Sequence, residues 1–315
     1  MTEPESPQPA APSVPQEPAS YIAGVFPGPG HALPNWVTEP LLGLQEALKM
    51  PLWLLIQNGD EEAFGNIGPA TCAGFFKARN RITVDGPVGL VIDSPGGSAH
   101  SAYRIARLFQ RRNREFTVIV PKYAKSAATL LALGADTLFL GKDAELGPLD
   151  VQILDPERED VGSALDAVQA LERLSAFSLS VVDQAMQMLL PRTQKKIETL
   201  LPLVLNFSAS LVRPLIESID SVDYSRKSRD LKVAEEYAIR LMTRKSKASV
   251  EDARTKARTL VEKYPTHGFV VDSDDAKALG LKLLPPDADL EPIIDMVTEL
   301  EERRLSLVGP FLAGE

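Results

Sequence analysis

The sequence is poor in the residues that crosslink a chain or hold a metal. It has one cysteine, Cys72, so an internal disulfide is impossible, and we interpret this residue as a buried side chain in a reducing compartment. Histidine is almost as scarce, with only His31, His100 and His267. These few residues show no metal-ligand spacing, so we expect neither a metal nor another cofactor. We therefore expect a cytoplasmic protein without a metal centre.

The chain also lacks excess positive charge and long apolar runs. Its net charge of -9 and pI of about 5.1 argue against general nucleic-acid binding. The most apolar stretch, Leu189 to Leu215, is interrupted by charged residues, so it predicts a pair of amphipathic helices and no membrane association. We expect breaks in these helices at three prolines, Pro191, Pro202 and Pro214.

The first 20 residues contain almost no large apolar side chain but are rich in proline. Such a segment cannot bury enough surface to offset the cost of ordering, so residues 1–20 are predicted to be a disordered tail. They lack the basic start and apolar centre of a secretory signal.

Beyond the tail, the pattern of apolar runs favours an α/β protein. Pro51 to Gln57, Val88 to Asp93, Phe116 to Pro121 and Thr137 to Leu140 are short apolar runs bounded by turn residues, as in strands buried on both faces. Helical spacing between the last three predicts β-α-β-α-β connectivity and a mostly parallel sheet. We assign residues 21–160 to this core, 161–248 to a helical insertion, and 249–315 to a C-terminal segment with further helices.

Two turns at successive strand ends suggest acyl-transfer chemistry. Pro95-Gly96-Gly97 ends one strand before a helix, and Ser126 opens the helix after the next strand. A serine nucleophile needs donors for the oxyanion, and the backbone N–H groups of Gly97 and Ala127, with Gly96 beside them, are suited to that role. Each residue also has a simpler explanation, since glycine permits tight turns and serine commonly caps helices. Their occurrence together at successive strand ends favours an active site.

The general base is harder to assign. His267 lies in a loop between a helix and a short apolar run, where rigid scaffolds often present functional side chains, and we favour it. His100 is nearer the glycines, but it stands in the first turn of a helix that can point it away. A desolvated lysine is the chemical alternative, and the available lysines are Lys125, Lys142, Lys77 and Lys122. Asp150, after the third strand, is our choice for the acid that orients the base.

These motifs resemble a known superfamily. Asp93 to Gly97 followed by Ser126 is similar to the Clp protease and crotonase-like enzymes, and the serine helix also resembles that of signal peptide peptidase A. The fuller resemblance is to the serine dehydrogenase proteinase family, through the Ser94 to Gly97 loop, Ala124 to Thr129, Leu146 to Asp150, and Tyr264 to Gly268 with Gly280-Leu281. It covers roughly Leu52 to Leu284.

The resemblance implies a Clp/crotonase-like β-α-β superhelical core and a serine endopeptidase acting on peptides or proteins. Its triad would follow the chain order Ser126, Asp150, His267. Gly147-Pro148-Leu149 stands where Clp protease carries its histidine, and no lysine follows at the peptidase-type position, so both departures favour His267. The superfamily also implies a homo-oligomer, a trimer or a multiple of it. Two alternatives stay open, namely a non-proteolytic acyl-CoA enzyme and a catalytically inactive scaffold on the same fold.

Overall fold

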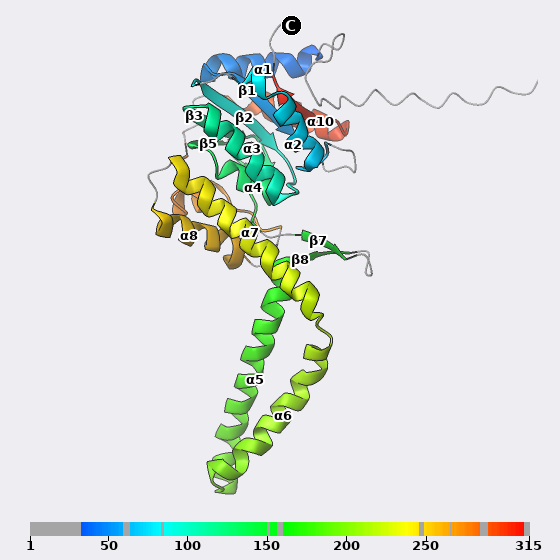
Figure 1. Cartoon of the computed structure of the whole chain (residues 1–315), viewed down its shortest axis with the longest axis vertical. Coiled ribbons are helices and arrows are strands. Elements are labelled where there is room, and N and C mark those ends of the chain that lie inside the picture. The colour runs from blue at the N-terminus through cyan, green and yellow to red at the C-terminus, as the bar shows by residue number, and fades with distance from the viewer. Residues whose placement is uncertain are drawn as a thin grey trace, which may run out of the picture.

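The computed structural model describes residues 33–58, 64–82, 85–149, 152–155, 160–245, 249–264, 266, 268–283 and 289–311. Within these ranges the chain forms a sheet covered by helices on both faces, and a long helical hairpin extends away from it (Figure 1). The fold is therefore mixed α/β, as the alternation of strands and helices predicted.

The central sheet has five strands in the order β5-β3-β2-β1-β9. Four of them are parallel and correspond to the four predicted runs: β1 (Leu52–Ile56), β2 (Pro87–Asp93), β3 (Glu115–Val120) and β5 (Thr137–Leu140). The fifth, β9 (Leu307–Pro310), is antiparallel to β1 and closes that edge of the sheet. The last described stretch of the chain thus returns to the core.

Both faces of the sheet are buried, because its strands are apolar at nearly every position. On β1, Trp53 and Leu55 belong to one core cluster, whereas Leu52 and Leu54 belong to a second. This alternation is expected, since successive side chains of a strand point to opposite faces. The two clusters are the two layers of the hydrophobic core.

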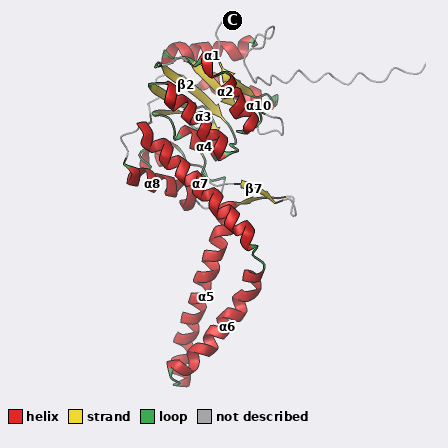
Figure 2. Ribbon diagram, in the orientation of Figure 1, coloured by secondary structure: helices red, strands yellow, loops and turns green. Residues whose placement is uncertain are grey.

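Separate groups of helices cover the two layers (Figure 2). One face carries α2 (Pro69–Lys77), a 3-10 turn (Arg79–Arg81), α3 (Ala99–Arg112) and α4 (Ala127–Ala132). The other carries α1 (Asn35–Leu48) and α10 (Glu291–Glu302), which contact each other.

Short strands and helices follow the main sheet. β4 (Tyr123–Ala124) pairs with β6 (Glu145–Leu146), and β7 (Gln152–Asp155) pairs with β8 (Asp160–Ser163). The hairpin is made of α5 (Ala164–Thr193) and α6 (Ile197–Glu217). From it α7 (Ser221–Lys245) runs back across the core, followed by α8 (Val250–Arg258), a π-helical turn (Thr259–Lys263) and α9 (Ser273–Ala278).

The predicted breaks at three prolines are wrong. Pro191 lies inside α5, and Pro202 and Pro214 lie inside α6, which is continuous over 21 residues. Each proline lacks an N–H and removes one helical hydrogen bond. All three are exposed, so water can take the place of the missing donor at the carbonyl one turn earlier. The chain reverses instead at residues 194–196, where Gln194 has a positive φ of 53°.

Candidate active site

Ser126 stands at a sharp strand-to-helix turn. It follows β4 and immediately precedes α4, with φ 49° and ψ -115°. A non-glycine residue in this conformation is strained, and such strain persists where the surrounding structure enforces it, often at functional sites. The side chain is half-buried and lines a cavity of about 370 Å³. The turn therefore places Ser126 at the wall of a partly open cavity, at the start of a helix.

The Gly96-Gly97 turn packs directly against this serine. A Cβ atom at Gly96 would lie 2.5 Å from the carbonyl oxygen of Lys125 and 3.0 Å from both the Cβ of Ser126 and the backbone N of Ala127. At Gly97 a Cβ would lie 2.8 Å from the carbonyl oxygen of Ile67. Both glycines also have positive φ, 103° and 136°. The two turns predicted to meet are thus in contact, and only glycine fits there.

The two glycines have different hydrogen-bonding roles. The N–H of Gly96, which the sequence analysis placed beside the two oxyanion donors, donates to the Ser94 hydroxyl at 3.1 Å. Between described residues, no hydrogen bond uses the N–H of Gly97 or of Ala127. Ala127 is the first residue of α4, where helical N–H groups lack intrahelical partners. These two amides are therefore the ones suited to an oxyanion.

A buried polar network fixes the glycine turn. The Ser94 hydroxyl donates to Gln57 Oε1 at 2.8 Å, and Gln57 Nε2 donates to the carbonyls of Phe64 and Asn66 at 2.7 and 2.6 Å. Ser94 and Gln57 are almost fully buried. Neither was singled out by the sequence analysis as a support of the site, although Ser94 belongs to the motif.

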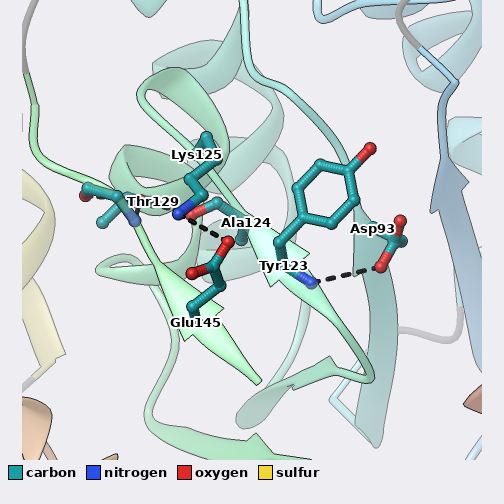
Figure 3. A network of polar contacts seen from close by, with 7 residues as sticks. Asp93, Tyr123, Ala124, Lys125, Thr129 and Glu145 are labelled. Atoms are coloured by element: carbon teal, nitrogen blue, oxygen red, sulfur yellow. Dashed lines mark hydrogen bonds and ion pairs between the residues drawn. The ribbon is translucent and has the colours of Figure 1, made fainter. Parts of the chain in front are cut away.

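On the opposite side, Thr129 ties the serine turn to the chain after β6. Its hydroxyl lies 2.6 Å from the carbonyl oxygen of Ala124, and both residues are labelled in Figure 3. The hydroxyl also lies 2.9 Å from the Gly147 carbonyl oxygen and 3.1 Å from the Gly147 N–H. Thr129 is fully buried. The two segments on either side of α4 are therefore held together by one side chain.

The lysines considered as bases are occupied or distant. Lys125 Nζ lies 2.7 Å from Glu145 Oε1, an ion pair visible in Figure 3. Lys122 Nζ pairs with Glu301 at 2.5 Å. Lys77 ends α2 and Lys142 follows β5, both exposed, and neither belongs to the described lining of the Ser126 cavity.

His100 does line that cavity, near the start of α3. Its ring contacts α7: the Tyr237 hydroxyl lies 3.0 Å from Nε2, and the two rings meet edge to face at 5.2 Å. Tyr237 in turn stacks on Tyr103. His100 is thus held at the rim of the cavity by an aromatic cluster that the sequence analysis did not predict.

His267 and Asp150 lie outside the described residues, but the segments that flank them are described. Leu146 and Val271 exchange two backbone hydrogen bonds of 2.9 Å, and the N–H of Leu149 donates to the Leu260 carbonyl at 2.9 Å. The rings of Tyr264 and Phe269 stack at 4.7 Å. The π-helical turn before Tyr264 is a local distortion of a kind frequent at functional sites.

Asp93 is a buried carboxyl beside the site. It ends β2, is 2% exposed, and accepts a hydrogen bond from the Tyr123 N–H at 3.2 Å (Figure 3). Burial raises the pKa of Asp93 from 3.8 to about 7, although the Tyr123 N–H and Lys122 act in the opposite direction. Burial and the neighbouring Asp93 also raise the pKa of the Tyr123 phenol. The sequence marked Asp93 only as part of the motif.

The rest of the cavity lining is mostly apolar and comes from helices and a loop. Leu130 of α4, Leu149, and Val233 and Ala234 of α7 form its walls, and Asp230 adds one carboxylate. Within the described ranges no group of three or more His, Cys, Asp or Glu side chains could hold a metal ion.

This mostly parallel sheet, with a strained serine at one strand-to-helix turn and a diglycine turn against it, defines a ClpP-like α/β fold. Residues 74–205 match the model of a family described as ClpP-like SDH-type serine proteinase. The match covers less than half of the chain; it supports the resemblance to that family seen in the motifs, and hydrolase and protease activity at a coarse level.

Two curated relatives, both uncharacterized proteins of Methanocaldococcus jannaschii, are 44% and 42% identical to the chain over 69 residues. Each alignment covers 22% of this chain and 24% of the relative. The similarity therefore concerns one part of the molecule.

Proposed function

We propose that the protein is a serine endopeptidase that hydrolyses peptide bonds through an acyl-enzyme on Ser126, with His267 as base and Asp150 as the acid that orients it. The observation that carries this proposal is the convergence of the described flanking segments. Leu149, one residue before Asp150, lines the Ser126 cavity and is hydrogen-bonded to Leu260. Val271, four residues after His267, is hydrogen-bonded to Leu146.

The same convergence reaches the serine turn itself. Gly147 is hydrogen-bonded to Ala124, and a Cβ at Gly147 would lie 3.1 Å from the Cα of Lys125, the residue before Ser126. The chain segments around positions 126, 150 and 267 are thus joined by hydrogen bonds. This is the arrangement that a triad with the order Ser, Asp, His requires.

The proposed reaction proceeds in two halves. Ser126 Oγ attacks the scissile carbonyl carbon while the imidazole of His267 takes its proton, and the oxyanion receives hydrogen bonds from the Gly97 and Ala127 amides. His267 then donates the proton to the leaving amine as the C–N bond breaks, which leaves an ester on Ser126. Water, deprotonated by His267, attacks that ester, and the serine regains its proton as the acid product departs.

The other candidate bases already have partners, which supports His267 as the general base. The ammonium of Lys125 is paired with Glu145 and that of Lys122 with Glu301. His100 already contacts the Tyr237 hydroxyl through Nε2. A side chain that must accept and return a proton at Ser126 needs a nitrogen directed to it.

Fluorophosphonate labelling tests the nucleophile. The folded protein should form one covalent adduct on Ser126, and Ser126→Ala should abolish both labelling and cleavage of a fluorogenic peptide library. Ser225→Ala, an exposed serine on α7, is the matched control and should label normally. Coenzyme A binding by a folded protein that resists the probe would favour the acyl-CoA alternative, and absence of both would favour the inactive scaffold.

Three variants test the base and the mode of cleavage. His267→Ala and Asp150→Asn should lower kcat by at least about 10³-fold, whereas His100→Ala should keep it within about tenfold. Internal cleavage of an end-blocked peptide should establish endopeptidase action. A larger loss of kcat in His100→Ala than in His267→Ala would instead identify His100, on α3, as the general base.

A further inference from the structure

The hairpin of α5 and α6 exposes far more apolar surface than a soluble two-helix arm requires. Among its described side chains, ten large hydrophobic residues are more than 40% exposed, including Phe177, Leu179, Leu203 and Phe207. The hairpin projects away from the sheet in Figure 1. Contiguous exposed apolar surface of this kind marks an interaction site.

The contact between the two helices is narrow. On α6 it uses one stripe at four-residue spacing, Leu200, Val204, Ser208 and Val212. At its middle the hydroxyls of Ser178 and Ser208 lie 2.9 Å apart, and the Ser208 hydroxyl donates to the Ser178 carbonyl. The apolar arc of each helix extends beyond this stripe, so α5 and α6 cannot cover each other.

One side of the hairpin gathers five of these ten residues, including both phenylalanines. At 100° per residue, Leu203, Phe207 and Leu211 share one side of α6, and Phe177 and Met188 share one side of α5. Because the helices are antiparallel and meet at Ser178 and Ser208, the two sets fall on the same side of the hairpin. We call these five residues the phenylalanine face.

A lipid bilayer is the less suitable occupant of this face. By length and composition α6 could cross a membrane, with 22% of its apolar window buried. However, the backs of both helices are polar and exposed, with Gln187 on α5 and Asn206 on α6, and Asp183 and Arg213 carry charges. Charged side chains within the hydrocarbon region are costly. The side of the hairpin opposite the phenylalanine face carries fewer exposed large apolar residues, Leu179, Leu205 and Ile216. A hairpin with polar outer edges and two unequal apolar sides fits a protein partner.

The charges at the two ends of the hairpin identify that partner. The tip carries three exposed cations, Arg192, Lys195 and Lys196, against one exposed acid, Glu198, so its net charge is positive. The base carries the exposed acids Glu217 and Asp220. The ends are separated by the 21 residues of α6, about 31 Å. Two hairpins related by a twofold axis and running antiparallel would therefore place each tip on the other's base.

We infer that the phenylalanine face binds the same face of a second copy of this chain, antiparallel, to form a four-helix contact. Two helices about 20 Å wide and about 31 Å long present about 600 Å² per copy, which is at the lower end of stable interfaces. The inference is independent of the chemistry at Ser126. It predicts an assembly with an even number of chains.

The full chain tests this through its oligomeric mass. In sedimentation velocity, Phe177→Glu with Phe207→Glu should halve the mass of the wild-type particle, because four charges would face each other in the pair. Gln187→Glu with Asn206→Glu adds the same charge to the polar back and should leave the mass unchanged. Circular dichroism should show the same helix content in all three proteins, since the four positions are exposed.

A charge swap tests the antiparallel orientation. Lys195→Glu with Lys196→Glu should weaken self-association at least tenfold, and so should Glu217→Lys in a separate protein. Mixing these two variants should restore association, since each tip would again meet a base of opposite charge.

Three results would overturn the inference. The first is a wild-type protein that stays monomeric at about 50 µM, where a pair with a micromolar Kd would be mostly dimeric. The second is an assembly unaffected by the phenylalanine variants. The third is co-sedimentation of a monomeric wild type with anionic vesicles, lost in those variants, which would assign the face to a membrane.

Discussion

Gly96 lies so close to Ser126 that a Cβ on the glycine would stand 3.0 Å from the Cβ of the serine. The same atom would be 2.5 Å from the Lys125 carbonyl oxygen, which is backbone and cannot rotate away. The glycine is thus required by the proximity of the serine turn, in addition to its own positive φ.

Gly96→Ala should therefore lower both stability and activity. We expect a loss of about 1–3 kcal/mol in the free energy of unfolding and displacement of Ser126, with fluorophosphonate labelling slowed at least tenfold. Urea unfolding and labelling kinetics measure the two effects. Gly43→Ala is the control, because a Cβ at this position inside α1 meets nothing within 4 Å and should be neutral or slightly stabilising. Equal behaviour of the two variants would contradict the steric argument.

Thr129→Val should uncouple the serine turn from Gly147. The substitution keeps the side-chain shape but removes a buried hydroxyl that lies within 3.1 Å of three backbone atoms. We expect a cost of about 1–3 kcal/mol in the free energy of unfolding and a reduced kcat. Thr255→Val on the exposed face of α8, where the hydroxyl bonds only the carbonyl one turn earlier, should change stability by less than about 0.5 kcal/mol.

Asp93→Asn should change how stability depends on pH. The pKa of Asp93 is raised from 3.8 to about 7 in the folded protein, so between these values the unfolded chain loses its proton first. The contribution of this group to the free energy of unfolding is therefore largest below about pH 4, falls as pH rises to about 7, and is constant above. The shift corresponds to at most about 4 kcal/mol.

The asparagine variant carries no such titration and should gain stability relative to the wild type as pH rises from about 4 to about 8. The difference between the two unfolding curves, measured at each pH, isolates the effect. A wild-type curve parallel to that of Asp93→Asn would show that the carboxyl is ionised at no cost.

Lys125→Gln separates a structural lysine from a catalytic one. The ammonium pairs with Glu145, so its removal should cost about 1 kcal/mol or less of stability and leave kcat within about fivefold. Glu145→Gln should behave in the same way. A thousandfold loss of kcat confined to Lys125→Gln would instead assign the base to this lysine.

Much of the core and of the serine turn could be predicted because local signals and tertiary structure agree there. Four apolar runs became the parallel strands, and the Gly96-Gly97 and Ser126 turns meet as expected, since parallel strands end at one edge of the sheet. The roles of Gln57 and Thr129 could not be foreseen. Each is a single polar residue in an apolar segment, and its partners are backbone atoms that only the folded chain brings near.

Elements that depend on distant partners were also missed. Leu307 to Pro310 is short and has little strand signal of its own, yet it pairs with β1. The prolines of α6 produced the opposite error, since they predicted helix breaks that the structure does not have. The cost of each missing hydrogen bond is small on an exposed helix in contact with α5. Asp150 and His267 stay predictions from the motifs and from the contacts of their neighbours.

The pairing of Trp53 with Pro310 joins residues about 250 positions apart in the chain. A contact of such high sequence separation forms late, because the entropy of closing so large a loop must be paid first. Until β9 arrives, β1 is an open edge strand of five buried residues, and such edges invite pairing with other chains. The yield of refolded protein should therefore depend steeply on protein concentration, with aggregation beginning at β1, a strand that is buried at every position in the native fold.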